Sequence, residues 1–258
     1  MRRPLPTILL LCAALSACAG PAGLPEAQKR RADRLISVFE NSTQVLQYGY
    51  VADLGDGRGY TAGRAGFCSG CGDLAEVVEA FVKKKPDSAL SGYLPALRRL
   101  GAAHDPSVKE LAGFPDDWRR AAAVPAMRAA QDEVSDRLYY RPALKLAAKL
   151  GLKSDLAKVA LYEAGIQHGF GDDPDGVPAL AAAASAGGAP AAGEREWLLR
   201  FMKARRAALA KAADPATRKA WAESVSRADA MLAILDSNGL AFSGALTFAV
   251  YGDTYTIR

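Results

Sequence analysis

One short block interrupts an otherwise helical pattern, and this interruption limits the folds that the chain can adopt. From Val45 to Phe67, tyrosines, β-branched residues and glycines replace the three-to-four-residue apolar spacing that predicts helices elsewhere. Residues 55–59 read Gly-Asp-Gly-Arg-Gly, which is turn chemistry, and Asp-Gly is a strong hairpin signal. The block therefore predicts a small antiparallel sheet within a mainly α protein of the α+β class.

The chain outside this block is predicted to be helical. A first helix is expected from about Pro25 to Glu40, because residues 41–43 compete for their own backbone and end it. Asp73 precedes the next apolar stripe and is a plausible N-cap. The first helix and the sheet suit one lobe of a two-lobed protein with a cleft. Further helices are expected at about 88–100, 107–112, 118–122, 125–150 with a kink at Pro142, 156–167, 178–186, 194–212 and 215–235, and one short strand at 246–257.

The first 23 residues have the pattern of a targeting signal, which leaves 24–258 as the folded domain. Arg2 and Arg3 precede an apolar stretch over 5–15 that is too short to span a bilayer. Leu-Ser-Ala-Cys at 15–18 fits cleavage before a lipid-modified Cys18, which would anchor the protein to a membrane. Ordinary cleavage after residue 19 fits as well. Either reading places the protein outside the cytoplasm, in the cell envelope or the medium.

Two cysteines remain in the predicted fold, Cys68 and Cys71. Their Cys-x-x-Cys spacing could form half of a zinc site or a redox pair. The chain has only two histidines, His104 and His168, and no second cysteine pair to complete a zinc site. Because the protein is expected outside the cytoplasm, a local disulfide or two inert thiols is the favoured interpretation, and no metal or cofactor is expected.

The distribution of charge argues against nucleic acid as a partner. The net charge of +5 is spread along the predicted helices, without a basic block. The segment 37–81 runs against this trend, since it holds six acidic residues and only Arg58 and Arg64 as bases. Such a local excess of acid is suited to a cationic ligand.

Two carboxylic residues of this segment could serve as an acid and base pair. Glu40 is predicted at a helix end, and Asp56 at a glycine-flanked turn where a bulky ligand can approach the backbone. Hydrolysis of a glycosidic bond needs two such groups on opposite faces of the bond. Spacing alone is also compatible with a solvated Glu40, with Asp56 as a turn residue only and with Arg58 as a plain surface charge.

The order of motifs resembles glycoside hydrolase family 46, the chitosanases. The resemblance covers about 33–257, and its most specific part is the block from Glu40 to Asp73. The matching segments are Phe-Glu-Asn-Ser at 39–42, Tyr-Gly-Tyr at 48–50, residues 53–61, 66–70 and 72–73, Gln-Asp-Glu at 131–133, Asp-Arg at 136–137, His-Gly at 168–169, Asp-Pro at 173–174 and Tyr-Gly-Asp-Thr-Tyr at 251–255.

The resemblance implies a lysozyme-like fold with two mainly helical lobes around a substrate cleft. It implies that Glu40 is the general acid, that Asp56 is the general base and that Thr61 helps to hold the attacking water. It further implies binding of glucosamine units by Ser42, Tyr50, Arg58, Asp73, His168 and Gly169. A supporting ion-pair network would consist of Glu163, Arg205 and Arg218, although Glu163 replaces the usual aspartate and the chain around Arg218 matches poorly. Cys71 is not expected in the family.

The resemblance therefore predicts an endo-acting, inverting hydrolase of β-1,4 bonds between glucosamine residues. Its partners would be chitosan and chitosan oligosaccharides, and it would act as a monomer. A lysozyme-like enzyme that lyses cell walls and an inactive carbohydrate-binding lipoprotein are the alternatives. The acidic segment favours an amino sugar, and the presence of both Glu40 and Asp56 favours an enzyme.

Overall fold

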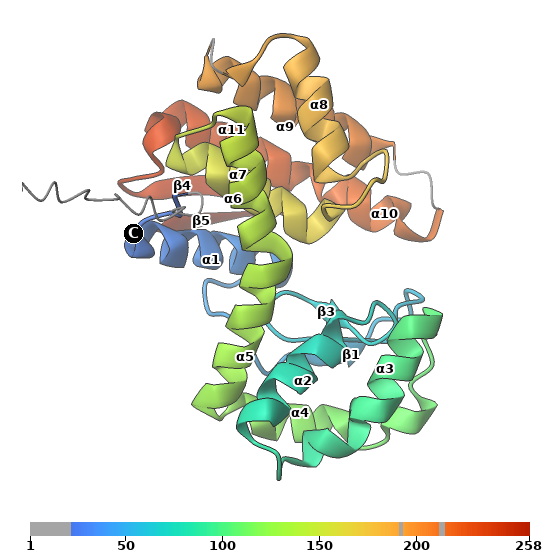
Figure 1. The fold of residues 1–258 in the computed structure, drawn as a ribbon. Helices are drawn as coiled ribbons and strands as arrows, with labels where there is room; N and C mark the ends of the chain where they lie inside the picture. Colours follow the sequence, from blue (N-terminus) through green and yellow to red (C-terminus); the bar gives the residue numbers. More distant parts are fainter. Residues whose placement is uncertain (1–21, 191–192, 212–214) are drawn as a thin grey trace, which may run out of the picture.

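The computed structural model describes residues 22–190, 193–211 and 215–258, which form two lobes (Figure 1). The targeting segment and Cys18 lie outside the described residues. Each lobe has its own cluster of buried apolar side chains. The predicted two-lobed, mainly helical fold is therefore confirmed. Within the described ranges, no helix is both long and apolar enough to cross a membrane.

One lobe, here called the sheet lobe, contains the three-stranded antiparallel sheet in the order β1-β2-β3. Its core includes the fully buried Phe67, Leu74 and Trp118. Its elements are β1 (Val51–Asp53), β2 (Tyr60–Ala62), β3 (Phe67–Cys68), α2 (Asp73–Lys84), η1 (Ala89–Tyr93), α3 (Leu94–Ala103), η2 (Lys109–Leu111), α4 (Phe114–Ala122) and α5 (Pro125–Ser135).

The other lobe, here called the terminal lobe, contains both ends of the described chain. Its central helix is α7, in which ten of the fourteen residues are buried. A helix that is buried over most of its surface is expected at the centre of a helical lobe. The elements are α1 (Glu26–Asn41), α6 (Arg141–Leu150), α7 (Asp155–His168), α8 (Val177–Ala186), α9 (Glu194–Ala210), α10 (Pro215–Glu223), α11 (Val225–Asn238), η5 (Gly239–Ala241), β4 (Leu246–Val250) and β5 (Asp253–Ile257).

A bent helix joins the lobes, as Figure 1 shows. Helix α5 continues through a wider π turn, η3 (Asp136–Tyr140), into α6. Pro142 follows directly, and proline lacks the N–H and its ring would clash with the carbonyl four residues earlier. The wide turn accommodates this ring. The predicted kink at Pro142 is therefore confirmed, and it lies where the chain passes from one lobe to the other.

Several sequence predictions about local structure were wrong. Helix α1 belongs to the terminal lobe and the sheet to the other, so the two do not share one lobe. Residues 45–50 form turns, and the sheet begins only at Val51. The segment 107–112 contains one 3₁₀ turn, η2.

The C-terminal region also differs from its prediction. The helix predicted over 215–235 is two helices that meet at Ser224. The single strand predicted over 246–257 is a hairpin, in which β4 pairs with β5 across Tyr251 and Gly252. Both turn residues have positive φ, at 53° and 89°. Two positive φ values are what a two-residue hairpin of type I′ requires.

Candidate active site

A cleft of about 560 Å³ lies between the two lobes. The terminal lobe contributes Glu40 and the start of the loop after α1, and the sheet lobe contributes Thr61 and Asp73. Because the two sides come from separate cores, side chains can face each other across a substrate. The lining residues are Glu40, Asn41, Thr43, Gln47, Tyr50, Leu54, Arg58, Thr61, Gly63, Ala65, Gly66, Cys71, Asp73, Tyr139, Gly165, Ile166 and Gly169.

Glu40 lies in the last turn of α1, where the helix ends at Ser42 in the left-handed conformation. Its side chain is 24% exposed, and its Oε1 lies 2.8 Å from Nη1 of Arg227. The carboxyl group thus lines the cleft, while the guanidinium of Arg227 holds one of its oxygens. A fixed carboxyl of this kind can deliver a proton to a defined point in the cleft.

Behind Glu40 lies a buried ion-pair network centred on Glu163. The guanidinium of Arg227 donates to Glu163 at 2.8 Å, and Arg205 donates to both oxygens of the same carboxylate. Burial raises the pKa of Glu163, but the charges and hydrogen bonds of the two arginines outweigh this and hold it below its ordinary value. Glu163 therefore stays ionised and fixes Arg227, which in turn holds Glu40.

The second arginine bonded to Glu163 is Arg227, which the sequence analysis did not name, and it takes the place expected for Arg218. Arg218 is exposed on α10, whereas Arg227 on α11 is only 4% exposed and contacts both Glu40 and Glu163. The sequence contains a pattern that indicates the buried position of Arg227. Arg227 lies four and seven positions before Met231 and Ile234, on the apolar stripe of its helix. An arginine on a buried face needs an acidic partner.

Asp56 lies in the turn between β1 and β2, and Arg58 holds it tightly. The Arg58 guanidinium donates twice to Oδ2, at 2.7 and 2.9 Å, and its backbone N–H donates to Oδ1 at 3.1 Å. Partial burial raises the pKa of Asp56, but these bonds and the arginine charge bring it below its ordinary value. Asp56 is consequently an ionised carboxylate over a wide pH range, as a general base must be.

The position after Arg58 requires a glycine for steric reasons. Gly59 has a φ of 74°, and a side chain there would come within 2.3 Å of Ser69 Oγ and 3.0 Å of a backbone carbonyl. The turn is therefore pressed against the loop after β3. This packing fixes the turn that carries Asp56 on a rigid part of the sheet lobe.

Thr61 lies in β2 and lines the cleft. Its side-chain oxygen is buried, and no residue in the described ranges hydrogen-bonds to it. A buried hydroxyl normally has a partner, and a water molecule is the simplest one at the wall of a cleft. The position therefore suits the predicted role of holding a water.

Asp73 is the first residue of α2, after Gly72 at the N-cap. The predicted cap role was wrong, because Asp73 accepts instead from the backbone N–H of Cys68 at 2.7 Å and from the Tyr139 hydroxyl at 3.3 Å. Burial raises its pKa to about 6, even though these hydrogen bonds lower it. A largely desolvated carboxyl that lines the cleft is suited to bind a cationic group.

The other residues assigned to substrate binding fall into two groups. Tyr50, Arg58 and Gly169 line the cleft, and Ser42 is exposed beside the lining residues Asn41 and Thr43. His168, in contrast, is buried and is not among the residues that line the cleft.

His168 is buried, and its Nε2 accepts from Nε of Arg205 at 3.3 Å. Burial and the charge of Arg205 lower the pKa of His168 to about 3, so the imidazole is neutral. Its assignment to substrate binding is therefore corrected. His168 extends the network behind Glu40, while the adjacent Gly169 lines the cleft.

Cys68 and Cys71 form a disulfide, with Cα atoms 5.2 Å apart. Of the two alternatives that the sequence left open, a local disulfide and two inert thiols, the structure has the disulfide. These cysteines and Asp73 are the one group in the described ranges whose ligand atoms are close enough for a metal ion. Because the sulfurs are bonded to each other, neither is a thiolate that could bind zinc. The disulfide instead fixes the loop that leads into Asp73.

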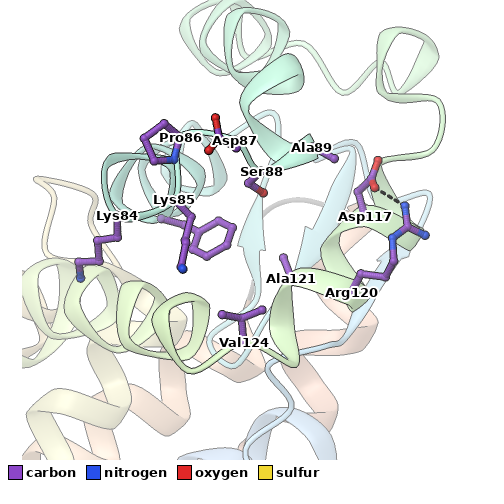
Figure 2. Close-up of a pocket in the computed structure, with 11 residues that line it drawn as sticks. Lys84, Lys85, Pro86, Asp87, Ser88, Ala89, Asp117, Arg120, Ala121 and Val124 are labelled. Carbon is purple, nitrogen blue, oxygen red and sulfur yellow. Dashed lines mark hydrogen bonds and ion pairs between the residues drawn. The ribbon is translucent and has the colours of Figure 1, made fainter.

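A second hollow, of about 700 Å³, lies in the sheet lobe (Figure 2). It is lined by Phe81 and Lys84 near the end of α2, whereas Asp73 at the start of α2 lines the cleft. The two hollows are therefore at opposite ends of one helix. Asp117 and Arg120 at the rim form an ion pair with each other. None of the predicted site residues lines this hollow.

The terminal lobe presents Glu40 to the cleft, and the sheet lobe presents Asp73 and carries Asp56 in the turn between the lining residues Leu54 and Arg58. Glycoside hydrolysis needs carboxyl groups on two sides of the scissile bond. The sequence matches glycosyl hydrolase family 46 over residues 34–243. The chain belongs to this family and is a glycoside hydrolase.

Known relatives agree with this assignment. A chitosanase of Bacillus subtilis strain 168 is 46% identical over 229 residues, which cover 87% of this chain and 83% of the relative. A mutant chitosanase from Bacillus subtilis MY002, complexed with 6 GlcN, has 44% identity and a TM-score of 0.86 over 92% of this chain and 100% of that one. A Gynuella sunshinyii chitosanase in complex with chitotetraose has 42% identity and a TM-score of 0.86, over 91% and 99%.

Proposed function

We propose that this protein is an endo-acting chitosanase, which hydrolyses β-1,4 bonds between glucosamine units with inversion at the anomeric carbon. The observation that carries the proposal is Asp73, a largely buried carboxyl group in the wall of the cleft. Glucosamine units bear ammonium groups, and a desolvated carboxylate is a strong partner for them. The chitosanase relatives, two of them in complex with glucosamine oligomers, support the same substrate.

In the proposed reaction, Glu40 donates its proton to the oxygen of the scissile bond. Asp56 removes a proton from a water that attacks the anomeric carbon from the opposite face, and Thr61 holds this water. The bond from carbon to the leaving oxygen breaks as the bond to the water oxygen forms. The two carboxyl groups must stand about 6.5–9.5 Å apart or more in the complex, to leave room for the water. Their origin in different lobes supports such a separation.

The open cleft supports cleavage within a chain. The alternatives find less support. A peptidoglycan lytic enzyme would have no need of a buried carboxylate for an ammonium group. An inactive binding protein would have no need of a fixed carboxyl on each side of the cleft.

We also propose that the protein is exported and acts as a monomer in the cell envelope or the medium, with Cys18 lipidated. The charged start, the short apolar stretch and the Leu-Ser-Ala-Cys sequence support export and lipidation.

The direct test of the activity is proton NMR of fresh hydrolysate from glucosamine oligomers. We expect the α-anomer first, with β appearing only by mutarotation, and loss of turnover by about 10²–10⁴-fold in Glu40→Gln and in Asp56→Asn. Chitosan solutions should lose viscosity well before reducing ends accumulate. Clearing of cell walls without release of glucosamine oligomers would favour the lytic enzyme, and initial β product would make Asp56 a nucleophile.

A further inference from the structure

The turn of the C-terminal hairpin places a tyrosine where tyrosine is disfavoured. Tyr251 has a φ of 53° at the first central position of the β4–β5 turn. This position of a type I′ turn is normally occupied by asparagine, aspartate or glycine, because other side chains are strained in the left-handed region. A large side chain at this strained position indicates a function outside the turn.

The hydroxyl of Tyr251 reaches the end of α1. It donates to the carbonyl of Phe39 at 3.0 Å, and Phe39 immediately precedes Glu40. The last carbonyls of a helix have no partner within the helix. Tyr251 therefore satisfies a free carbonyl next to the proposed general acid. Burial raises the pKa of Tyr251, so the hydroxyl keeps its proton and remains a donor.

The same residue is also tied to α11, which carries Arg227. The backbone N–H of Tyr251 donates to Oγ of Ser226 at 3.4 Å, and Ser226 directly precedes Arg227 in this helix. The Arg227 guanidinium in turn lies over the Phe39 ring at 5.4 Å. Tyr251 thus connects the peptide before Glu40 with the helix that supplies its ion-pair partner.

A second tyrosine of the hairpin holds the other side of Glu40. The hydroxyl of Tyr255 donates to the carbonyl of Ser42 at 3.2 Å. Its ring stacks on Phe248, which packs edge-on against Phe39 at 5.7 Å. The hairpin therefore contacts α1 both before and after Glu40, and in Figure 1 it lies beside this helix.

We propose that Tyr251 is a positioning residue. It fixes the end of α1, so that the Glu40 carboxyl stays paired with Arg227 and within reach of the scissile oxygen. The proposal rests on the proposed role of Glu40. Tyr251 does not act on the substrate itself. A displaced general acid loses rate steeply, whereas substrate binding along the rest of the cleft is unaffected.

The test uses two substitutions with opposite effects on the turn. Tyr251→Phe removes only the hydroxyl and keeps the strained conformation. Tyr251→Asn also removes the contact to Phe39 but relieves the strain, since asparagine is favoured at this position. Thr247→Val is the matched control, because it removes the exposed hydroxyl pair between Thr247 and Thr256 in the same hairpin without touching α1. Steady-state kinetics on glucosamine oligomers and melting temperatures are measured for all three.

We expect kcat to fall about tenfold to a hundredfold in both Tyr251 variants, with KM within about twofold of wild type. The asparagine variant should melt at or above the phenylalanine variant, and Thr247→Val should keep wild-type kcat. A wild-type kcat in either Tyr251 variant would overturn the proposal. The proposal would also be overturned if the asparagine variant had both a higher melting temperature and a kcat closer to that of wild type, because stability alone would then explain the effect. If wild type hydrolyses chitosan and Glu40→Gln is inactive, such a result refutes this inference and not the proposed function.

Discussion

Replacing Asp73 by asparagine is expected to make the protein more stable at neutral pH and less active on glucosamine oligomers. Burial raises the pKa of Asp73 from its ordinary value of 3.8 to about 6. The folded protein therefore binds a proton at this site more tightly than the unfolded chain does. The stability that the protonated carboxyl contributes is fully present below pH 3.8 and is lost as the pH rises through about 6.

The magnitude follows from this pKa. A pKa raised from 3.8 to about 6 corresponds to about 3 kcal/mol against the ionised form. Asparagine has no charge to desolvate and keeps an oxygen for the N–H of Cys68. It loses the acceptor for the Tyr139 hydroxyl, which costs about 1 kcal/mol. The net gain in the free energy of unfolding should thus be about 2 kcal/mol above pH 7. Below about pH 4 only the lost hydrogen bond should remain, as a deficit of about 1 kcal/mol.

The measurement is urea unfolding of both proteins at several pH values between 4 and 8. A difference in stability that is constant with pH would refute the reasoning, because the desolvated carboxylate would then not be its cause. Activity should move the other way. Loss of a charged hydrogen bond to an ammonium group, worth about 1.5–3 kcal/mol, should lower kcat/KM by about tenfold to a hundredfold.

Two further predictions concern the acid network and export. Arg227→Gln should destabilise the fold by about 3–5 kcal/mol and lower kcat, because it leaves the buried Glu163 with one arginine fewer. Arg206→Gln, which breaks an exposed ion pair with Asp229, should cost less than about 1 kcal/mol, and equal losses for the two variants in urea unfolding would contradict the role of Arg227 in the network. In the native host the full-length protein should fractionate with membranes, and Cys18→Ala should abolish this. Wild-type protein found only in the medium would refute lipidation.

The sequence predicted the residues that line the cleft better than the residues that hold them in place. Glu40 and Asp73, which line the cleft, were predicted because they belong to one compact motif block with an unusual order. Asp56 belongs to the same block, but its neighbours Leu54 and Arg58 line the cleft and Asp56 itself does not. Arg227 was missed because motif position pointed to Arg218, around which the chain matches the family poorly. The periodicity of α11 was the better guide, since it places Arg227 on the buried face.

Long-range contacts explain the other errors. His168 follows Leu161 and Ala164 on the buried stripe of α7, so helix spacing alone could have predicted that it faces the core. The role of the C-terminal hairpin could not be predicted, because Tyr251 and Phe39 are 212 residues apart in sequence. Local pattern fixes which face of an element is buried, but the partner of that face depends on the tertiary fold.

Another buried arginine lies where the two lobes meet. Arg64, in the sheet lobe, is 4% exposed and forms ion pairs with Asp33 on α1 at 2.8 Å and with Asp132 on α5 at 3.1 Å. Lys29 on α1 extends this cluster to Asp136 at the π turn. The cluster therefore connects the first helix, the sheet lobe and the bend of the joining helix.

Buried ion pairs cost desolvation energy, and apolar residues of similar shape often stabilise a fold equally well. Stability alone is therefore a weak explanation for Arg64 and Arg227, whereas geometry accounts for both. A charged hydrogen-bonding partner allows few arrangements, while apolar contacts allow many. Arg227 fixes Glu40 within the terminal lobe, and Arg64 fixes the sheet lobe against α1, the helix that carries Glu40. Two ion clusters thus hold Glu40 in place, one behind the acid and one that connects its helix to the sheet lobe.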